Sequence, residues 1–244
     1  MNRYYYDFHI HSCLSPCAEN DMTPNNIAGM ATLAGLNIVA LTDHNTTKNC
    51  PAFFEAAAHH GIIPVAGMEL TTAEDIHLVC LFPTLVHAMN VGDEVEKRRM
   101  TIKNRPEIFG DQLIMDSEDR VTGTVEELLI SGTDITVEEA PALAQSYGGV
   151  CYPAHIDRES NGIIAVLGAF PETLEFTSAE LHDGDKLYEY RELVNLPEKA
   201  FIVSSDAHNL WSIKEKTDFI ELDPQDESDG AVRRCLIEYL RCKK

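Results

Sequence analysis

Short apolar segments of strand length alternate with helical segments along this chain, and the alternation restricts the folds open to it. Residues 4–10, 38–41 and 62–66 are rich in aromatic and aliphatic side chains, as expected of buried strands. Between them, apolar residues recur at helical spacing over residues 24–34 and 51–60. Strands that alternate with helices form a parallel sheet whose faces the helices cover. The sequence therefore predicts an α/β fold.

The ends of the two predicted helices carry residues that favour helix termini. Thr23 is a suitable N-cap for the first helix, and Pro24 suits its first turn, where the missing N–H leaves no helical hydrogen bond unmade. Gly35 follows the first helix and Gly61 follows the second, as is common where a helix ends. These signals indicate two successive strand–helix units.

The same pattern resumes later in the chain and suggests a closed barrel. Further strands are predicted over residues 76–82, 150–154, 179–182, 201–203 and 219–222, and a final helix over residues 229–242. Seven or eight strands with helices between them favour a closed (β/α) barrel over an open sheet. A length of 244 residues is typical of one such barrel.

The regular pattern is interrupted between residues 84 and 147. This stretch is charged and rich in turn-forming residues, and strand-like pieces occur only at residues 112–115 and 125–130. We interpret residues 84–147 as an inserted subdomain that acts as a lid. The barrel would then consist of residues 1–83 and 148–244.

Composition excludes several classes of function. The chain has 40 acidic and 19 basic residues, a formal net charge of −21, which repels long polyanions. We therefore expect no stable nucleic-acid complex. The seven cysteines include no CxxC pair and are expected to be free thiols. Because the chain has neither an apolar run of about 18 residues nor a signal peptide, we expect no membrane association and a cytoplasmic location.

Side chains of the types that bind metals follow one predicted strand after another. They are His9, His11, His44, Glu69, His155, Asp206 and His208. Because the carboxyl ends of parallel strands converge on one face, these residues are expected to meet in space. In an extended segment, two histidines separated by one residue point to the same side. Nitrogen and oxygen ligands suit Zn²⁺, Mn²⁺ or Fe²⁺, so the sequence predicts a metal site.

Six short motifs then resemble those of the PHP family, named for polymerase and histidinol phosphatase. They are His9-Ile10-His11-Ser12, Thr42-Asp43-His44-Asn45, Gly67-Met68-Glu69, His77-Leu78-Val79, Pro153-Ala154-His155 and Ser205-Asp206-Ala207-His208. Their order and spacing agree with the family along most of the chain, apart from residues 84–147. The resemblance implies a distorted (β/α)₇ barrel that holds two or three divalent metal ions at one centre.

The resemblance also implies how the ligands are shared. One metal would be held by His9, His11, Glu69 and Asp206, a second by His44 and His208, and a third by His77 and His155 with the other oxygen of Glu69. One position departs from the family. Pro16 stands where small phosphoesterases of this type carry an aspartate, and we expect Glu19, or alternatively Asp21, to supply the missing oxygen to the second metal.

The resemblance implies a metal-dependent phosphoesterase that hydrolyses a small phosphomonoester or nucleotide with a metal-activated hydroxide. Arg158, three residues after His155, is expected to neutralise charge on the phosphoryl group. Asp43 is expected to orient an imidazole, and His182 is a candidate for the lining of the pocket. His59, His60 and His87 are assigned no chemistry.

Other functions are consistent with the same residues. A short-oligonucleotide exonuclease is the alternative within the hydrolases, and the acidic charge disfavours it. A non-catalytic metal-stabilised binding domain would be expected to lack several ligands, whereas this chain keeps nearly all of them. A metal-dependent amidohydrolase would usually need a carboxylated lysine at the end of a strand, and no lysine is predicted there.

Overall fold

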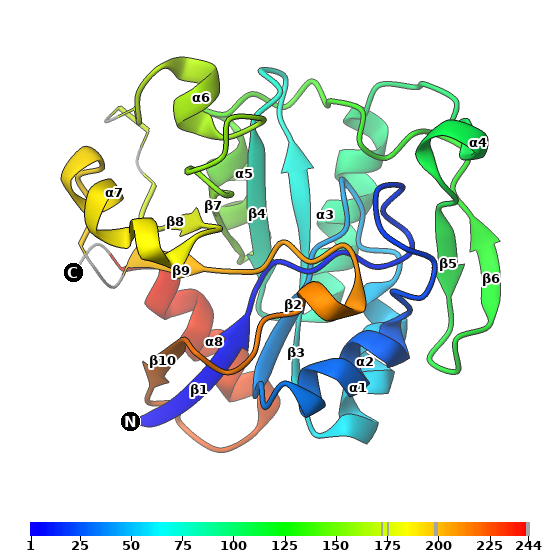
Figure 1. Ribbon diagram of the computed structural model, residues 1–244, viewed down its shortest axis with the longest axis horizontal. Coiled ribbons are helices and arrows are strands. Elements are labelled where there is room, and N and C mark those ends of the chain that lie inside the picture. Colours follow the sequence, from blue (N-terminus) through cyan, green and yellow to red (C-terminus); the bar gives the residue numbers. More distant parts are fainter. Residues whose placement is uncertain (172, 175, 198–199, 243–244) are drawn as a thin grey trace.

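A curled mixed sheet forms the centre of the computed structural model (Figure 1), which describes residues 1–171, 173–174, 176–197 and 200–242. Its six strands, in spatial order, are β10 (Phe219–Leu222), β1 (Asn2–Asp7), β2 (Ile38–Leu41), β3 (Ile63–Thr71), β4 (His77–Phe82) and β7 (Val150–Pro153). Two further pairs of strands lie outside this sheet. They are the parallel pair β8 (Ala179–Leu181) and β9 (Phe201–Val203), and the hairpin of β5 (Leu113–Met115) and β6 (Val121–Thr124). The expected α/β class is confirmed.

The strands do not all run parallel, which corrects one expectation. β1, β2 and β3 are parallel, as predicted, but β4 is antiparallel to both β3 and β7, and β10 is antiparallel to β1. The cause is the short connection over residues 72–76, in which Asp75 has a φ of 65°. A connection of this length makes a tight turn and cannot hold the crossover that parallel strands require.

The reversal of β4 decides where one expected metal ligand lies. His77 is the first residue of β4 and pairs with Thr71 at the end of β3. Because β4 runs in the opposite direction, its amino end lies at the carboxyl ends of β1, β2 and β3. His77 therefore reaches the same face as the residues that follow the parallel strands.

Helices surround the sheet. They are α1 (Pro24–Leu33), α2 (Cys50–His60), α3 (Leu85–Arg98), α4 (Pro106–Phe109), α5 (Ala140–Ser146), α6 (Ile163–Leu167), α7 (Leu187–Leu193) and α8 (Asp229–Arg241). The predicted termini are confirmed where Thr23 accepts a hydrogen bond from the Asn26 amide and where Gly61 is left-handed with a φ of 70°. In the part of the chain that the structure describes, no helix is long and apolar enough to cross a membrane.

The stretch over residues 84–147 supplies two of the helices that cover the sheet. α3 packs against β3 and β4, and α5 packs against β4 and β7. The hairpin β5–β6 lies at one side of the central sheet and its helices (Figure 1). The strand predicted at residues 112–115 is confirmed as β5, but the one at residues 125–130 is wrong. Val125 and Leu129 pack on Leu14 as part of an irregular segment, so their apolar character reflects burial and not pairing.

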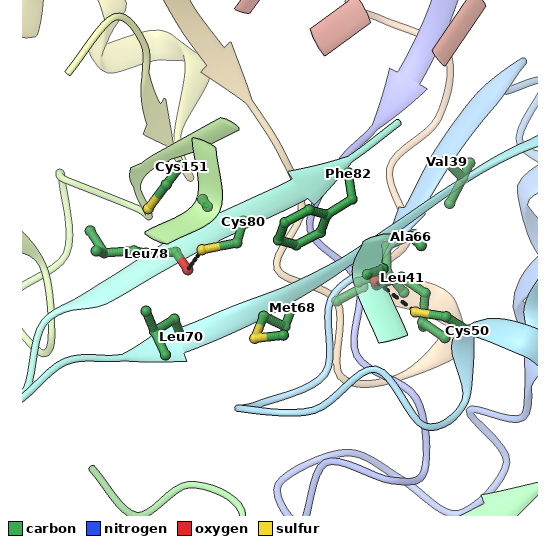
Figure 2. Packing of buried hydrophobic residues seen from close by; sticks show 14 of the residues in the cluster. Val39, Leu41, Cys50, Ala66, Met68, Leu70, Leu78, Cys80, Phe82 and Cys151 are labelled. Carbon is green, nitrogen blue, oxygen red and sulfur yellow. Dashed lines mark hydrogen bonds between the residues drawn. The ribbon is translucent and has the colours of Figure 1, made fainter. Parts of the chain in front are cut away.

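Alternation along β3 and β4 separates an apolar face from the face that carries the site. Met68 and Leu70 of β3 pack beside Leu78, Cys80 and Phe82 of β4 in one cluster under the helices (Figure 2). Since successive side chains of a strand point to opposite faces, Glu69 lies on the other face, inside the curl of the sheet. The position of Glu69 thus follows from the period of the strand.

Candidate metal centre

Backbone hydrogen bonds align the segment after β1, which carries His9 and His11, with the segment after β9, which carries Asp206 and His208. The amide of His11 donates to the Ala207 carbonyl at 2.9 Å, and the amide of Ala207 donates to the His9 carbonyl at 3.3 Å. This short parallel bridge follows β1 and β9. It places the segment with His9 and His11 directly beside the segment with Asp206 and His208.

A second bridge brings His44 to Glu69. The amide of Asn45 donates to the Glu69 carbonyl at 2.9 Å, and the side chain of Asn45 accepts from the Thr71 amide at 2.8 Å. Asn45 has a φ of 52°, a left-handed conformation that asparagine tolerates better than most residues. The sharp turn it makes directs His44 back over the end of β3.

Glu69 is the centre of the arrangement. Its side chain is 1% exposed. Its Oε1 lies 3.4, 2.8 and 3.0 Å from nitrogens of His9, His77 and His155, and its Oε2 lies 3.3 and 3.0 Å from nitrogens of His11 and His44. Five imidazoles thus surround one carboxylate, which is the geometry expected of a carboxylate that bridges metal ions.

Three groups of side chains offer ligand atoms within 4.8 Å of one another and could hold a metal ion. They are His9, His11, Glu69 and Asp206; His11, His44 and His208; and His44, Glu69 and His77. The first group contains the four residues that the resemblance implies for one metal. His155 adjoins the third group through its contact with Glu69. The structure therefore brings together eight of the nine predicted ligands.

Several features of this cluster suit metal cations that bind nitrogen and oxygen ligands. The Nδ1 atom of His155 is buried and has no hydrogen-bond partner, and the buried Nδ1 of His44 faces Glu69 Oε2 at 3.0 Å without forming a hydrogen bond. A buried polar atom without a partner costs free energy. Glu69 and Asp206 are buried beside them, and buried carboxylates need compensating charge. A divalent cation between these groups would satisfy both requirements.

The imidazoles and carboxylates of the cluster shift one another's pKa values. Burial alone would lower the pKa of His9, but Glu180, Asp206 and Glu69 raise it well above the ordinary value. Burial likewise opposes a charge on His11, yet hydrogen bonds to Asp206 and Glu69 raise its pKa to about 9. Burial would raise the pKa of Glu69, but the nearby imidazoles of His77 and His9 hold it well below the usual range. Protons on imidazoles thus compensate the carboxylates, in the place where metal ions would do so.

His44 and His208 behave in the opposite way. Burial, together with the charge of His11, lowers the pKa of His208 to about 4. Burial also lowers the pKa of His44 well below its ordinary value, although Glu69 partly offsets this effect. Both imidazoles are therefore neutral at pH 7, and a neutral imidazole is the form that binds metals.

Several residues that the sequence analysis missed hold the histidines in place. Glu180 of β8 is fully buried, and its Oε1 lies 2.7 Å from His9 Nδ1. The Ser15 hydroxyl lies 2.9 Å from His11 Nδ1 and donates to Asp43. Asp43 thus acts on His11 through Ser15, and not by direct contact. The signal for Glu180 was an acid within an otherwise apolar strand, which is rarely buried without a partner.

Arg158 lies at the edge of the cluster, between two cavities. Its Nη1 donates to Asp206 Oδ2, and its Nη2 lies 3.2 Å from His182 Nδ1. One cavity of about 390 Å³ contains His44, Glu69, His77 and other cluster residues in its wall. The second, of about 890 Å³, is lined partly by His182. Arg158 and Asp206 line both, so the cavities adjoin at this pair.

The loop that was expected to supply the missing oxygen places its residues differently. The side chain of Glu19 is exposed, and neither Glu19 nor Asp21 lines the cavity of the cluster. Cys17, between them and Pro16, does line it. Cys17 is exposed as a whole, yet partial desolvation of its thiol and the negative charge of Glu69 raise the pKa of that thiol. The role expected of Glu19 stays a prediction that this geometry does not support.

The sequence profile of the PHP domain matches residues 7–150, which is more than half of the chain. The chain belongs to the PHP domain family. The family resemblance drawn from the six motifs is thereby confirmed, and with it the expectation of a metal-dependent hydrolase. The matched range includes the first two histidine motifs, Glu69 and His77. A search among curated proteins finds no match to this PHP protein.

Solved structures share the fold of this PHP protein at low sequence identity. Endonuclease Q from Pyrococcus furiosus is 19% identical, with a TM-score of 0.63 over 96% of this chain and 55% of that one. This chain thus spans about half the length of endonuclease Q. An amidohydrolase from Chromobacterium violaceum is 18% identical, with a TM-score of 0.58 over 90% and 92% of the two chains. A protein from Bifidobacterium adolescentis, described as a metal-dependent phosphoesterase, is 16% identical, with a TM-score of 0.57 over 95% of both chains.

Proposed function

We propose that this PHP protein hydrolyses a small phosphomonoester or mononucleotide at a centre of two or three divalent metal ions. The observation that carries the proposal is the position of Glu69, whose two oxygens face five histidines beside a cavity of about 390 Å³. A buried carboxylate shared among several imidazoles provides neighbouring metal sites. Zn²⁺, Mn²⁺ and Fe²⁺ suit this donor set.

Bound metal ions would lower the pKa of a water molecule and so supply hydroxide at neutral pH. The protein's own residues would perform the remaining tasks. Arg158, whose guanidinium faces both cavities, would bind an oxygen of the phosphoryl group and neutralise part of its charge. Asp43 would hold His11 in orientation through Ser15. Burial of the cluster keeps bulk water from the ligands and strengthens each of these electrostatic contacts.

We further propose that the curled sheet is a distorted (β/α)₇ barrel and that part of residues 84–147 covers its open end. Support comes from the side chain of Asn45, which donates to the carbonyls of Leu129 and Ser131 at 2.7 and 3.0 Å. Between these two residues, Ile130 lines the cavity of the cluster. These contacts hold the segment beside the cavity, where a cover would favour a compact substrate.

The charge of the chain also supports a small substrate. With a formal net charge of −21, the protein repels any phosphate that does not contact metal or Arg158. In the adjoining cavity, Asp218 is paired with Lys214, and Asp183 and Asp185 add negative charge to the wall. The affinity for a polymer would therefore gain little from its additional phosphates.

DNA cleavage is the second candidate, and one comparison favours it. Endonuclease Q was solved with a 27-mer duplex substrate that carries an abasic lesion at its active site, and that structure has a TM-score of 0.62 over 96% of this chain and 56% of the other. This likeness conflicts with the expectation of no stable nucleic-acid complex. Both candidates use the same metal centre, so the substrate must be decided by assay.

The test compares substrates side by side at fixed ionic strength with Mn²⁺. Phosphorylated metabolites and mononucleotides are screened together with an oligonucleotide of about ten residues and a duplex with an abasic site. We expect kcat/KM for the best small substrate to exceed that for either DNA by about tenfold or more, a difference of about 1.4 kcal/mol in transition-state binding. Faster cleavage of DNA would replace the proposal with the second candidate. A metal-loaded protein without activity on any substrate would support a non-catalytic binding domain.

A further inference from the structure

One of the three ligand groups consists of imidazoles alone. His11, His44 and His208 offer ligand atoms within 4.8 Å of one another, and the group contains no carboxylate of its own. The carboxylates beside the group, Glu69 and Asp206, also contact His9, so a dication here would share their charge with a neighbouring ion. A four-coordinate metal at this position would also need a further ligand. A further donor from a neighbouring segment would therefore complete the site.

The loop over residues 12–22 is the segment beside this group, and its backbone is held in place. The amide of Glu19 donates to the His208 carbonyl at 2.9 Å, and the amide of Cys13 donates to the Met22 carbonyl at 2.8 Å. Within the loop, the amide of Ala18 donates to the Ser15 carbonyl at 3.0 Å. These bonds fix Cys17 within two residues of the contact with His208.

Cys17 is the residue of this loop that lines the cavity of the cluster. It lines the cavity of about 390 Å³ together with His44 and His208, whereas Glu19 and Asp21 do not. A second observation points to a ligand in the same place. His44 also lines this cavity and is 4% exposed, and its Nδ1 faces Glu69 Oε2 at 3.0 Å without forming a hydrogen bond. A buried imidazole nitrogen of this kind is prepared to bind a metal ion.

We infer that Cys17 supplies a thiolate ligand to the metal held by His44 and His208. This inference rests on the proposed metal centre and adds a sulfur donor to it. The Sγ atom of Cys17 is outside the three ligand groups defined by the 4.8 Å limit. A rotation of the Cys17 side chain to another staggered rotamer therefore accompanies metal binding. On binding, the S–H bond breaks, the sulfur–metal bond forms and the proton passes to solvent. A thiolate makes this site favour Zn²⁺ over Mn²⁺.

The test replaces the native metal with Co²⁺, because a thiolate bound to Co²⁺ gives a charge-transfer absorption band in the near ultraviolet. We expect the full chain to show this band after titration with Co²⁺. The band should be absent in Cys17→Ala and present in Cys242→Ser, a control that changes an exposed cysteine elsewhere. Cys17→Asp should bind Co²⁺ through oxygen, without the band. Competition with a chelator should show an affinity for Zn²⁺ about tenfold or more lower in Cys17→Ala.

The outcomes separate this inference from the proposed function. Bound Co²⁺ without a thiolate band, or a band that persists in Cys17→Ala, overturns the role of Cys17 and leaves the remainder of the metal centre intact. Failure to bind any Co²⁺ overturns both. Circular dichroism of Cys17→Ala and Cys17→Asp checks that the variants are folded, and folded Cys17→Ala with unchanged affinity for Zn²⁺ also contradicts the inference.

Discussion

The Nδ1 atom of His9 lies 2.7 Å from Oε1 of Glu180, and both side chains are fully buried. The same oxygen accepts a hydrogen bond from the His155 amide at 3.2 Å. A proton on Nδ1 that faces a carboxylate leaves Nε2 of His9 free to bind metal. That Nε2 lies 3.4 Å from Glu69 and 3.3 Å from Asp206. One carboxylate therefore orients two residues of the candidate centre.

The first prediction concerns this pair. Glu180→Gln retains an acceptor for the two donors but removes the charge that makes His9 a better ligand. We expect its affinity for metal to fall about 10- to 100-fold, with a larger loss in Glu180→Ala. Chelator competition measures the affinity, and Glu238→Gln on the exposed face of α8 serves as the control. Unchanged affinity in both Glu180 variants would show that the pair has only a structural role.

The second prediction separates the roles of Glu69 and Arg158. Glu69 contacts five histidines, so Glu69→Ala should remove more than one equivalent of bound metal. Arg158 contacts Asp206 and His182 at the edge of the cavities, so Arg158→Ala should retain its metal and lose kcat/KM for a phosphomonoester. Metal analysis and steady-state kinetics on the same preparations check both. Equal loss of metal in the two variants would be inconsistent with these assignments.

The third prediction concerns the stability of the metal-free protein at alkaline pH. His11 has a pKa of about 9 when folded, raised from 6.5 by Asp206 and Glu69 against the effect of burial. Protonated His11 therefore contributes fully to the free energy of unfolding below pH 6.5, and this contribution is lost as the pH rises through 9. The loss would be up to about 3 kcal/mol, at about 1.4 kcal/mol per pKa unit.

Thermal unfolding after chelation, measured between pH 6.5 and 9.5, tests this prediction. We expect Tm to fall as the pH rises, and to fall less in His11→Gln, which has no imidazole to titrate. His44 and His208 have lowered pKa values, so they are uncharged in the folded protein over this window. A Tm that rises with pH in the metal-free protein would contradict the assignment.

The fourth prediction concerns the strand that carries Glu69. A Cβ on Gly67 would lie 2.5 Å from the Cys80 carbonyl oxygen and 2.8 Å from a methyl of Leu81, so β3 must move away from β4. Gly67→Ala should lower the free energy of unfolding by about 1–3 kcal/mol and weaken metal binding by displacing Glu69. Gly123→Ala on β6, where the nearest atom is 3.7 Å away, should change it by less than about 0.5 kcal/mol. Urea denaturation of the two variants makes the comparison.

Sequence periodicity was sufficient for the parts of the site that follow parallel strands. His9, His44, Glu69 and Asp206 were predicted together because apolar strands end just before them or contain them. His77 required the direction of β4, which depends on the short turn at residues 72–76 and not on the strand pattern. The family resemblance implied His77 as a ligand, and the antiparallel pairing of β4 explains why it reaches the candidate site.

The residues that support the ligands were harder to predict. Glu180 is distant from His9 in the chain, and the contact between them depends on the pairing of β8 with β9 and on the bridge between the segments that follow β9 and β1. The loop that contains Cys17 has no repeating pattern, so side-chain directions in it follow from individual hydrogen bonds such as that between Glu19 and His208. The carboxylate of Glu19 makes it the expected ligand from sequence, whereas in the folded loop Cys17 lines the cavity.

Metal content and activity measured on one preparation test the central claim most directly. The protein is purified from cells grown in metal-replete medium and analysed for transition metals. Its hydrolysis of a phosphomonoester is assayed before chelation, after chelation and after Mn²⁺ or Zn²⁺ is added back. The account predicts at least two metal ions per chain, loss of hydrolysis on chelation and recovery on addition. Fewer than one metal ion per chain, or hydrolysis that survives complete removal of metal, would contradict it.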